Sequence, residues 1–162
     1  MKFKIYKALL VVSAAIVLNG CSKQETDPLM DARPDVPVSF PNATAYRPDP
    51  TVSTSIAAGG AIEIQLSIPE QSGRTITEIS KIAVFTSYSR IQGASNFYVA
   101  TPIPVNGTSY TYKTSLTEYY SKNPTAAVAK PNEELSNRFY FLIKLDDGST
   151  IVTMPVRILV LS

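Results

Sequence analysis

The segment after Gly59 and Gly60 alternates between aliphatic and polar side chains. Because successive side chains of an extended strand point to opposite faces, this period of two places every aliphatic residue on one face. The pattern therefore predicts a half-buried β-strand, which Pro69 ends. The aliphatic positions are Ile62, Ile64, Leu66 and Ile68.

Two dipeptides predict β-hairpins between apolar or aromatic runs. Asn-Gly and Asp-Gly favour two-residue hairpin turns, because these residues accept positive φ. Proline has no N–H for a strand ladder, so Pro102 and Pro104 place one strand at an edge, and Pro155 predicts a bulge or an edge in the last strand. The hairpins are Asn106-Gly107, between residues 97–105 and 109–114, and Asp147-Gly148, between residues 139–145 and 150–161.

Ser115 and Glu118 provide a helical signal, because their spacing is that of a capping box at the start of a helix. We expect about two helical turns here, with Tyr119 and Tyr120 among the residues that face the sheets. Residues 124–131 are polar and alanine-rich and are bounded by prolines, which predicts a surface loop.

Short strands, turn signals and little helix are typical of an all-β sandwich, and we expect about seven strands over residues 56–162. Residues 138–161 combine an aromatic strand, an Asp-Asp-Gly turn and a long aliphatic strand. This run resembles the last hairpin of immunoglobulin-like domains in cell-surface lipoproteins. The resemblance implies an immunoglobulin-like or fibronectin-like β-sandwich with one short helix, and it carries no catalytic residue.

Residues 21–55 differ in composition, because six of the twelve prolines lie there among Asp, Ser and Thr. Proline favours extended polyproline geometry and does not nucleate a helix. We therefore expect residues 21–55 to be a disordered tether. Val36, Val38 and Phe40 alternate with other residues, which leaves a short edge strand as the alternative.

The first twenty residues have the layout of a secretory signal. Lysines precede an apolar run, residues 8–18, and the small residue Gly20 follows it. The run is shorter than the roughly twenty residues that a membrane-crossing helix needs. We therefore expect residues 1–20 to be removed as a signal peptide.

Leu18, Asn19, Gly20 and Cys21 resemble the bacterial lipobox. The resemblance implies that the Cys21 thiol receives a diacylglycerol, that the signal is cut before this cysteine, and that the new amino group is acylated. Two or three acyl chains make a stable anchor, whereas a single chain is marginal. We therefore expect an outer membrane lipoprotein of the cell envelope, attached to the membrane through lipid on Cys21.

The residue inventory argues against several functions. The signal peptide holds three of the 15 basic side chains and none of the 13 acidic ones, so its removal leaves a formal charge of about −1 and no reason to expect a nucleic-acid partner. Histidine is absent and Cys21 is the only cysteine, which removes the commonest general base and metal ligands. Asp146 and Asp147 fit a turn better than a calcium loop. We expect no enzyme, no cofactor and no metal site.

Tyrosine is the remaining signal, with nine in the chain. Aromatic rings stack on sugars or anchor partners, but they also fill half-buried strands. Tyr110 and Tyr112 share one face of a predicted strand, so they are the candidate ligand-binding residues, exposed beside the edge strand 97–105. The alternative is that both tyrosines fill the core.

We therefore expect a monomeric, non-catalytic accessory module on the outer membrane that binds a glycan or a protein partner. The resemblance to small immunoglobulin-like lipoproteins implies a setting in glycan uptake. The alternative is a structural subunit or adhesin, in which the apolar final strand, residues 151–161, pairs with the sheet edge of another protomer.

Overall fold

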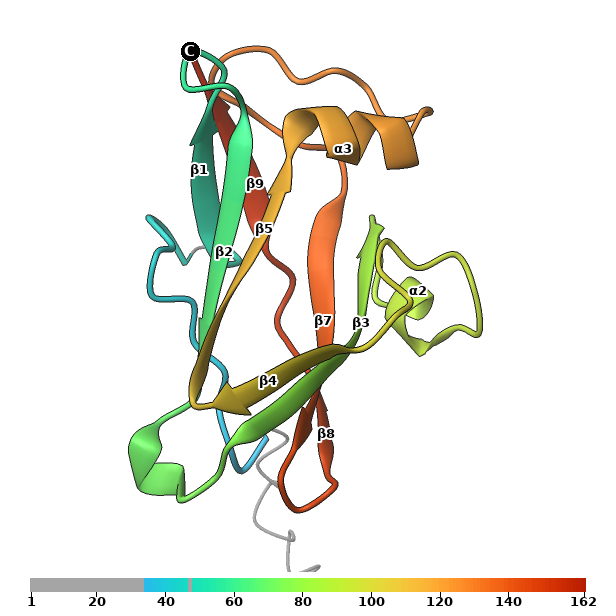
Figure 1. Ribbon diagram of the computed structural model, residues 1–162. Coiled ribbons are helices and arrows are strands. Elements are labelled where there is room, and N and C mark those ends of the chain that lie inside the picture. Colours follow the sequence, from blue (N-terminus) through green and yellow to red (C-terminus); the bar gives the residue numbers. More distant parts are fainter. Residues whose placement is uncertain (1–33, 47) are drawn as a thin grey trace, which may run out of the picture. The chain divides into compact units, whose positions relative to one another are not determined.

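The computed structural model describes residues 34–46 and 48–162 (Figure 1). Nine strands and three short helices lie within this part of the chain. This part is an all-β sandwich with little helix, as the strand patterns predicted. The elements are β1 (Thr51–Ser55), β2 (Ala61–Ser67), η1 (Glu70–Ser72), β3 (Ile76–Phe85), α2 (Ser89–Gln92), β4 (Ile103–Gly107), β5 (Ser109–Ser115), α3 (Leu116–Lys122), β6 (Glu133–Glu134), β7 (Arg138–Leu145), β8 (Thr150–Val152) and β9 (Arg157–Leu161).

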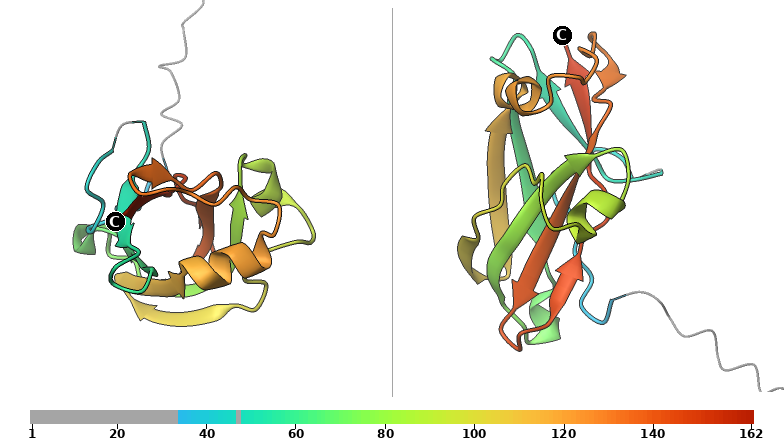
Figure 2. Two further views of the ribbon diagram at one scale, coloured as in Figure 1. Left: turned by 90° about the horizontal axis from the view of Figure 1, so that it is seen from above. Right: turned by 90° about the vertical axis from the view of Figure 1, so that its right-hand side faces the viewer.

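The strands form three hydrogen-bonded groups, which are β2-β5, β4-β3-β7-β8 and β1-β9-β6. All pairings are antiparallel except that of β1 with β9, which is parallel. Viewed along the strands, β1 and β2 lie on one side of the core, and β3 and β7 lie on the other (Figure 2). α3 lies across one end of the sandwich, and α2 projects beside β3 (Figures 1 and 2).

The core lies between these strands and is built from alternating side chains. On β2 the aliphatic residues are buried while Glu63 is exposed, so the strand predicted from the period of two is confirmed. Burial of each large aliphatic or aromatic side chain contributes about 2 kcal/mol to folding. The largest fully buried side chains are Tyr119, Tyr140, Phe40, Phe139, Phe141, Ile62, Ile64, Leu66, Ile68, Ile76, Ile79 and Ile82.

The folded unit begins at Pro34, earlier than the proline pattern predicted. Ser39 exchanges two backbone hydrogen bonds with Ser67, at 2.8 and 2.9 Å, and the neighbouring Phe40 is 0% exposed. The prediction of a disordered tether over residues 21–55 is therefore wrong for its described part, because apolar residues there pack on the core and pair with the sheets. The short edge strand considered for Val36–Phe40 is present as a single bridge at Ser39.

The Asp147-Gly148 hairpin is confirmed. Gly148 has φ +82°, and its N–H donates to the Leu145 carbonyl at 3.0 Å, which closes the turn between β7 and β8. The expectation of one last strand over residues 150–161, with a bulge or an edge at Pro155, is wrong: the run is divided there, so that β8 pairs with β7 while β9 pairs with β1 and β6.

The prediction of a hairpin at Asn106-Gly107 is wrong. Gly107 pairs with Ile76 of β3, whereas Ser109 pairs with Ser67 of β2, so the chain crosses from one group of strands to the other between β4 and β5. β4 nevertheless lies at a sheet edge, as its prolines predicted. The dipeptide therefore marks a change of sheet, with β4 paired to β3 and β5 paired to β2.

α3 begins where the capping box predicted, because the Ser115 hydroxyl accepts from the Glu118 backbone N–H at 3.1 Å. Its Tyr119 is fully buried. The two other helices, η1 and α2, are single turns without a side-chain cap, which explains why no pattern indicated them. Around α2, Ile91 packs on the outer face of the sheet against Ala83 and Tyr140.

Candidate functional site

Tyr110 and Tyr112 both face the core, because they pair with Leu66 and Ile64 on the buried face of β2. Tyr112 is 6% exposed, and its ring packs edge-on against Phe141 with centroids 5.7 Å apart. Tyr110 is half-buried at the margin of the same cluster. The expectation of exposure is therefore wrong for Tyr112, which fills the core, whereas Tyr110 remains partly accessible.

Of the two strands that form the final run, β9 has strand neighbours on both sides. β9 is bonded to β1 over residues Arg157–Leu161 on one side and to β6 through Leu159 and Val160 on the other. Pairing with another protomer through β9 would first have to break one of these pairings, whereas β8, which also belongs to residues 151–161, lies at the edge of its sheet. The alternative function therefore gains no support from β9, and the sheet edge that it could use within residues 151–161 is the three-residue β8.

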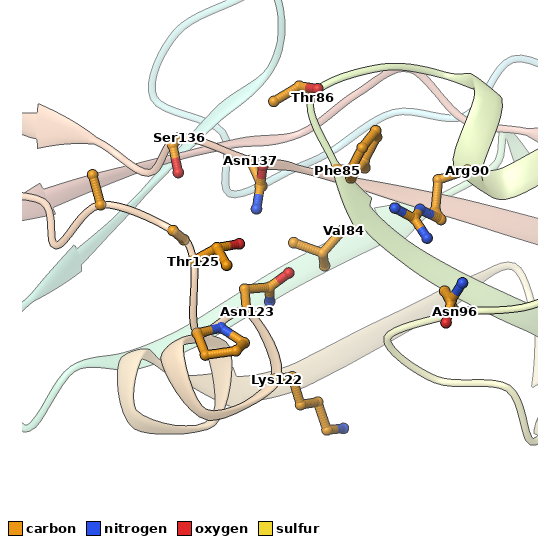
Figure 3. A pocket seen from close by; sticks show the side chains of 13 residues that line it. Val84, Phe85, Thr86, Arg90, Asn96, Lys122, Asn123, Thr125, Ser136 and Asn137 are labelled. Carbon is orange, nitrogen blue, oxygen red and sulfur yellow. The ribbon is translucent and has the colours of Figure 1, made fainter.

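A pocket of about 570 Å³ opens at the end of α3 (Figure 3). The end of β3 and α2 form one side of it, and the segments 122–127 and 136–137 form the other. Its volume lies within the usual range of ligand-binding cavities. The uncharged polar side chains that line it are Thr86, Asn96, Asn123, Thr125, Ser136 and Asn137, and the charged ones are Arg90 and Lys122.

Two smaller hollows of about 310 and 280 Å³ adjoin the pocket and share residues with it. The first adds Phe97 and Tyr98 to the lining, and the second adds residues around α2. Asn96 lines all three cavities and has a positive φ of 63°. Asparagine tolerates this left-handed conformation better than most residues, and such positions cluster at functional sites. Together the three cavities form a groove rather than a single hole.

Tyr119 holds one wall of the pocket in place. Its carbonyl accepts from the backbone N–H and from Nδ2 of Asn123, both at 2.9 Å, at the end of α3. Its hydroxyl accepts from the Asn137 backbone N–H at 3.2 Å. Because Tyr119 is 0% exposed and packs on Phe139, both polar segments are tied to the core. This wall is therefore formed before a ligand arrives.

The opposite wall is tied down by backbone bonds. Tyr98 donates its N–H to the Ile82 carbonyl at 2.8 Å, and the Ile82 N–H donates to Val99 at 2.9 Å. These bonds return the segment that contains α2 to the edge of β3. The Tyr98 hydroxyl also bonds the Thr114 hydroxyl at 2.7 Å, which joins this wall to β5. Burial raises the pKa of Tyr98 to about 12, so the phenol is neutral at physiological pH.

The two cations of the pocket have different surroundings. Lys122 forms an ion pair with Glu118 at 2.8 Å and donates to the Tyr98 carbonyl at 3.1 Å. The hydrogen bond from Lys122 is the main reason that the pKa of Glu118 is lowered. Glu118 thus offsets the charge of Lys122, whose side chain extends away from the centre of the pocket in Figure 3.

Arg90 carries the other charge. Its guanidinium carbon lies 4.2 Å from the centroid of the Phe85 ring, in a cation–π contact. The described residues include no acidic partner for Arg90 within ion-pair distance. Figure 3 shows the guanidinium between Phe85 and Asn96, directed toward the cavity.

The lining of the three cavities contains hydrogen-bond donors and acceptors but no aspartate or glutamate. Elsewhere, Glu63 pairs with Lys113 at 2.8 Å, and Asp147 pairs with Arg74 at 2.9 Å. No group of acidic or sulfur-bearing side chains within residues 34–46 and 48–162 could hold a metal ion. These lining residues can therefore orient a polar ligand, but none is a carboxylic acid or base suited to hydrolysis.

Sequence patterns did not indicate this pocket. Arg90, Asn96, Asn123 and Asn137 come from three separate segments without a shared motif. The nearest signal was the polar loop predicted at 124–131, whose start forms part of the wall. An excess of amide side chains over charged ones in the long loops is the feature that could have drawn attention to it.

The predicted lipidation residue, Cys21, lies outside the described residues, as does the predicted signal peptide. Within the described part of the chain, no helix has the length and apolar character needed to cross a membrane.

Comparison with known proteins gives no relative. No protein-family model, no curated protein and no solved structure matches this chain.

Proposed function

We propose that this protein is a non-catalytic binding module that holds a glycan in the groove beside α3. The observation that carries the proposal is the lining of the main pocket, where six amide or hydroxyl side chains meet without a carboxylate. Tyr119 and the backbone bonds at Ile82 tie both walls to the sandwich. Such a site is suited to recognition rather than to reaction.

A glycan fits this lining because sugar hydroxyls both donate and accept hydrogen bonds. Amide and hydroxyl side chains do the same, so each can satisfy a sugar hydroxyl in either sense. Phe85 and Phe97 are half-buried along the groove, and the part of each ring that Arg90 or Lys81 does not cover is available to the apolar face of a sugar. The connected hollows suit an extended oligosaccharide better than one small molecule.

The proposal includes a lipid anchor at Cys21 and a place in the outer membrane of the cell envelope. The lysines, the apolar run of residues 8–18 and the sequence Leu18 to Cys21 support it. The module would then act as a monomer at the membrane surface, without nucleic acid or cofactor. Its setting would be glycan uptake.

We further propose that the sandwich is immunoglobulin-like. In chain order, β2 and β5 pair as the B and E strands do in that fold, and β4-β3-β7-β8 has the order of C′, C, F and G. The parallel pairing of β1 with β9 adds the first strand to the last one.

Glycan binding can be tested with residues 21–162 carrying Cys21→Ser, so that no lipid is attached. The purified chain is applied to an oligosaccharide array, and hits are measured by isothermal titration calorimetry. Asn137→Ala removes one side-chain amide from the pocket but keeps the backbone N–H that donates to the Tyr119 hydroxyl. We expect it to weaken binding about tenfold, as for one lost hydrogen bond of about 1.4 kcal/mol.

Asn106→Ala is the matched control, because Asn106 is an exposed asparagine on β4 and does not line the groove. It should bind as the parent does. Equal affinities of the parent and Asn137→Ala, or an array without any hit, would contradict the proposal.

A further inference from the structure

We propose that the glycan is acidic, and that Arg90 binds its carboxylate or sulfate group. This inference rests on the proposed function and adds the charge of the ligand to it. It is carried by the position of Arg90 in the main pocket and in the adjoining hollow around α2. The guanidinium of Arg90 contacts the Phe85 ring, and its end, which carries the N–H donors, is directed toward the cavity (Figure 3).

The contact with Phe85 prepares Arg90 for an anion. The guanidinium carbon lies over the aromatic ring, 4.2 Å from its centroid, and the N–H groups of a guanidinium lie in its plane. These donors form a fork that matches the two oxygens of a carboxylate or sulfate. Because the ring already limits the rotation of the side chain, binding an anion loses less side-chain entropy than it would with a free arginine.

The charge balance of the groove favours the same conclusion. Lys122 is offset by Glu118, and no acidic residue lines any of the three cavities. Arg90 is therefore the positive charge of the lining for which the described residues show no acidic partner. A neutral ligand that displaced water from this charge would leave it poorly solvated, whereas an anionic ligand would compensate it.

Asn96 completes the recognition site. It lines the same cavities as Arg90, and Figure 3 shows the two side chains on the same side of the main pocket. The amide nitrogen can donate to a second oxygen of the anion or to a neighbouring sugar hydroxyl.

The test uses an array of oligosaccharides in matched pairs, in which each acidic member has a neutral counterpart. Uronic-acid oligomers are paired with their methyl esters, and sulfated oligomers with their desulfated forms. We expect the acidic member to bind at least about tenfold more tightly, since a charge-assisted hydrogen bond contributes about 1.5–3 kcal/mol. The pair in which the acidic member binds more tightly than its neutral counterpart shows whether the group is a carboxylate or a sulfate.

Arg90→Gln should abolish the preference for the acidic member, and Arg90→Lys should retain part of it, because lysine keeps the charge without the planar fork. Arg74→Gln is the control, since it removes the same charge from a residue that pairs with Asp147 and does not line the groove. Thermal unfolding of each variant checks that the fold is intact.

The outcomes separate the two proposals. Neutral members that bind as tightly as acidic ones, with no effect of Arg90→Gln, would overturn the acidic ligand and leave glycan binding standing. An array without any hit would overturn both. The preference of the parent chain tests the acidic ligand even if Arg90→Gln fails to fold, and Arg90→Lys then tests the role of Arg90; an acidic preference that both Arg90 variants retain in full would overturn that role.

Discussion

Arg157 donates from its Nε atom to Oδ2 of Asp49 at 3.0 Å, and so joins the last strand to the segment that precedes the first. Both side chains are 18% exposed. A second nitrogen of the same guanidinium donates to Glu134 of β6 at 2.7 Å. One arginine thus connects three segments at the parallel edge of the sandwich, where β1 and β9 would otherwise be held by backbone bonds and apolar packing.

Removal of this arginine should destabilise the domain. We expect Arg157→Ala to lower the free energy of unfolding by about 2 kcal/mol, because it leaves the largely buried carboxylate of Asp49 without its main partner. Urea denaturation measures the change through its midpoint. Arg74→Ala breaks a more exposed ion pair, with 41% of the arginine side chain accessible, and should cost less than about 1 kcal/mol. Equal losses from both variants would contradict the structural role of Arg157.

Tyr112 and Tyr110 should differ in stability when truncated, although they lie on the same face of β5. Tyr112→Ala removes a ring that packs on Phe139 and Phe141 inside the core, so we expect a loss of about 3–5 kcal/mol in the free energy of unfolding. Tyr110→Ala should lose clearly less, because that side chain is half-buried.

Tyr112→Phe is the matched control for this comparison. It keeps the ring, so it should retain most of the stability that Tyr112→Ala loses. Urea denaturation of the three variants decides between a core and a surface role. A melt of Tyr112→Ala that matches the parent would mean that this tyrosine is not part of the core.

Local signals predicted the elements that local interactions form. The alternation at Ile62–Ile68 gave β2, Ser115 and Glu118 marked the start of α3, and Asp147-Gly148 marked a hairpin, because each depends on residues close together in the chain. Asn106-Gly107 failed since its outcome depends on distant partners, Ile76 and Ser67. A turn motif indicates that the chain can reverse its direction, but it does not determine which strand the following segment pairs with.

Composition misled the prediction at residues 34–55. The many prolines there indicated a tether, yet Phe40 and Val52 are buried, and β1 forms a parallel pair with the last strand of the domain. Proline does not prevent an extended segment from lying along a sheet, since it removes single donors only. The groove was missed for a related reason, because Arg90, Asn96 and Asn137 meet only after the loops are placed by the sheets.

The lipid anchor is predicted to be independent of the fold. Cys21→Ser should abolish labelling with an alkyne fatty acid and release the protein from membranes. It should leave the melting temperature of the domain unchanged, because the folded unit begins at Pro34. Ser22→Ala is the control and should label normally. A Cys21→Ser protein that still labels, or that still sediments with membranes after a carbonate wash, would refute the anchor.

The buried phenol of Tyr98 should make the domain sensitive to alkaline pH. Burial is the main cause that raises its pKa to about 12, above the usual value of about 10, while the hydrogen bond with Thr114 acts in the opposite direction. The folded state therefore favours the neutral phenol more than the unfolded state does. The associated stability is fully present below about pH 10 and is lost as the pH rises toward 12.

Urea denaturation at pH 7, 9, 10.5 and 11.5 tests this dependence. The contribution of Tyr98 to the free energy of unfolding should be the same at pH 7 and pH 9 and should fall at pH 10.5 and 11.5. Tyr98→Phe cannot ionise, so it should start from a lower stability, because the bond to Thr114 is lost, but decline less steeply above pH 10. Tyr112 is also buried with a raised pKa, so a residual decline is expected in this variant. An equal alkaline slope in the parent and in Tyr98→Phe would show that ionisation of Tyr98 does not limit stability, and that the hydroxyl reaches solvent more freely than its position between β5 and α3 implies.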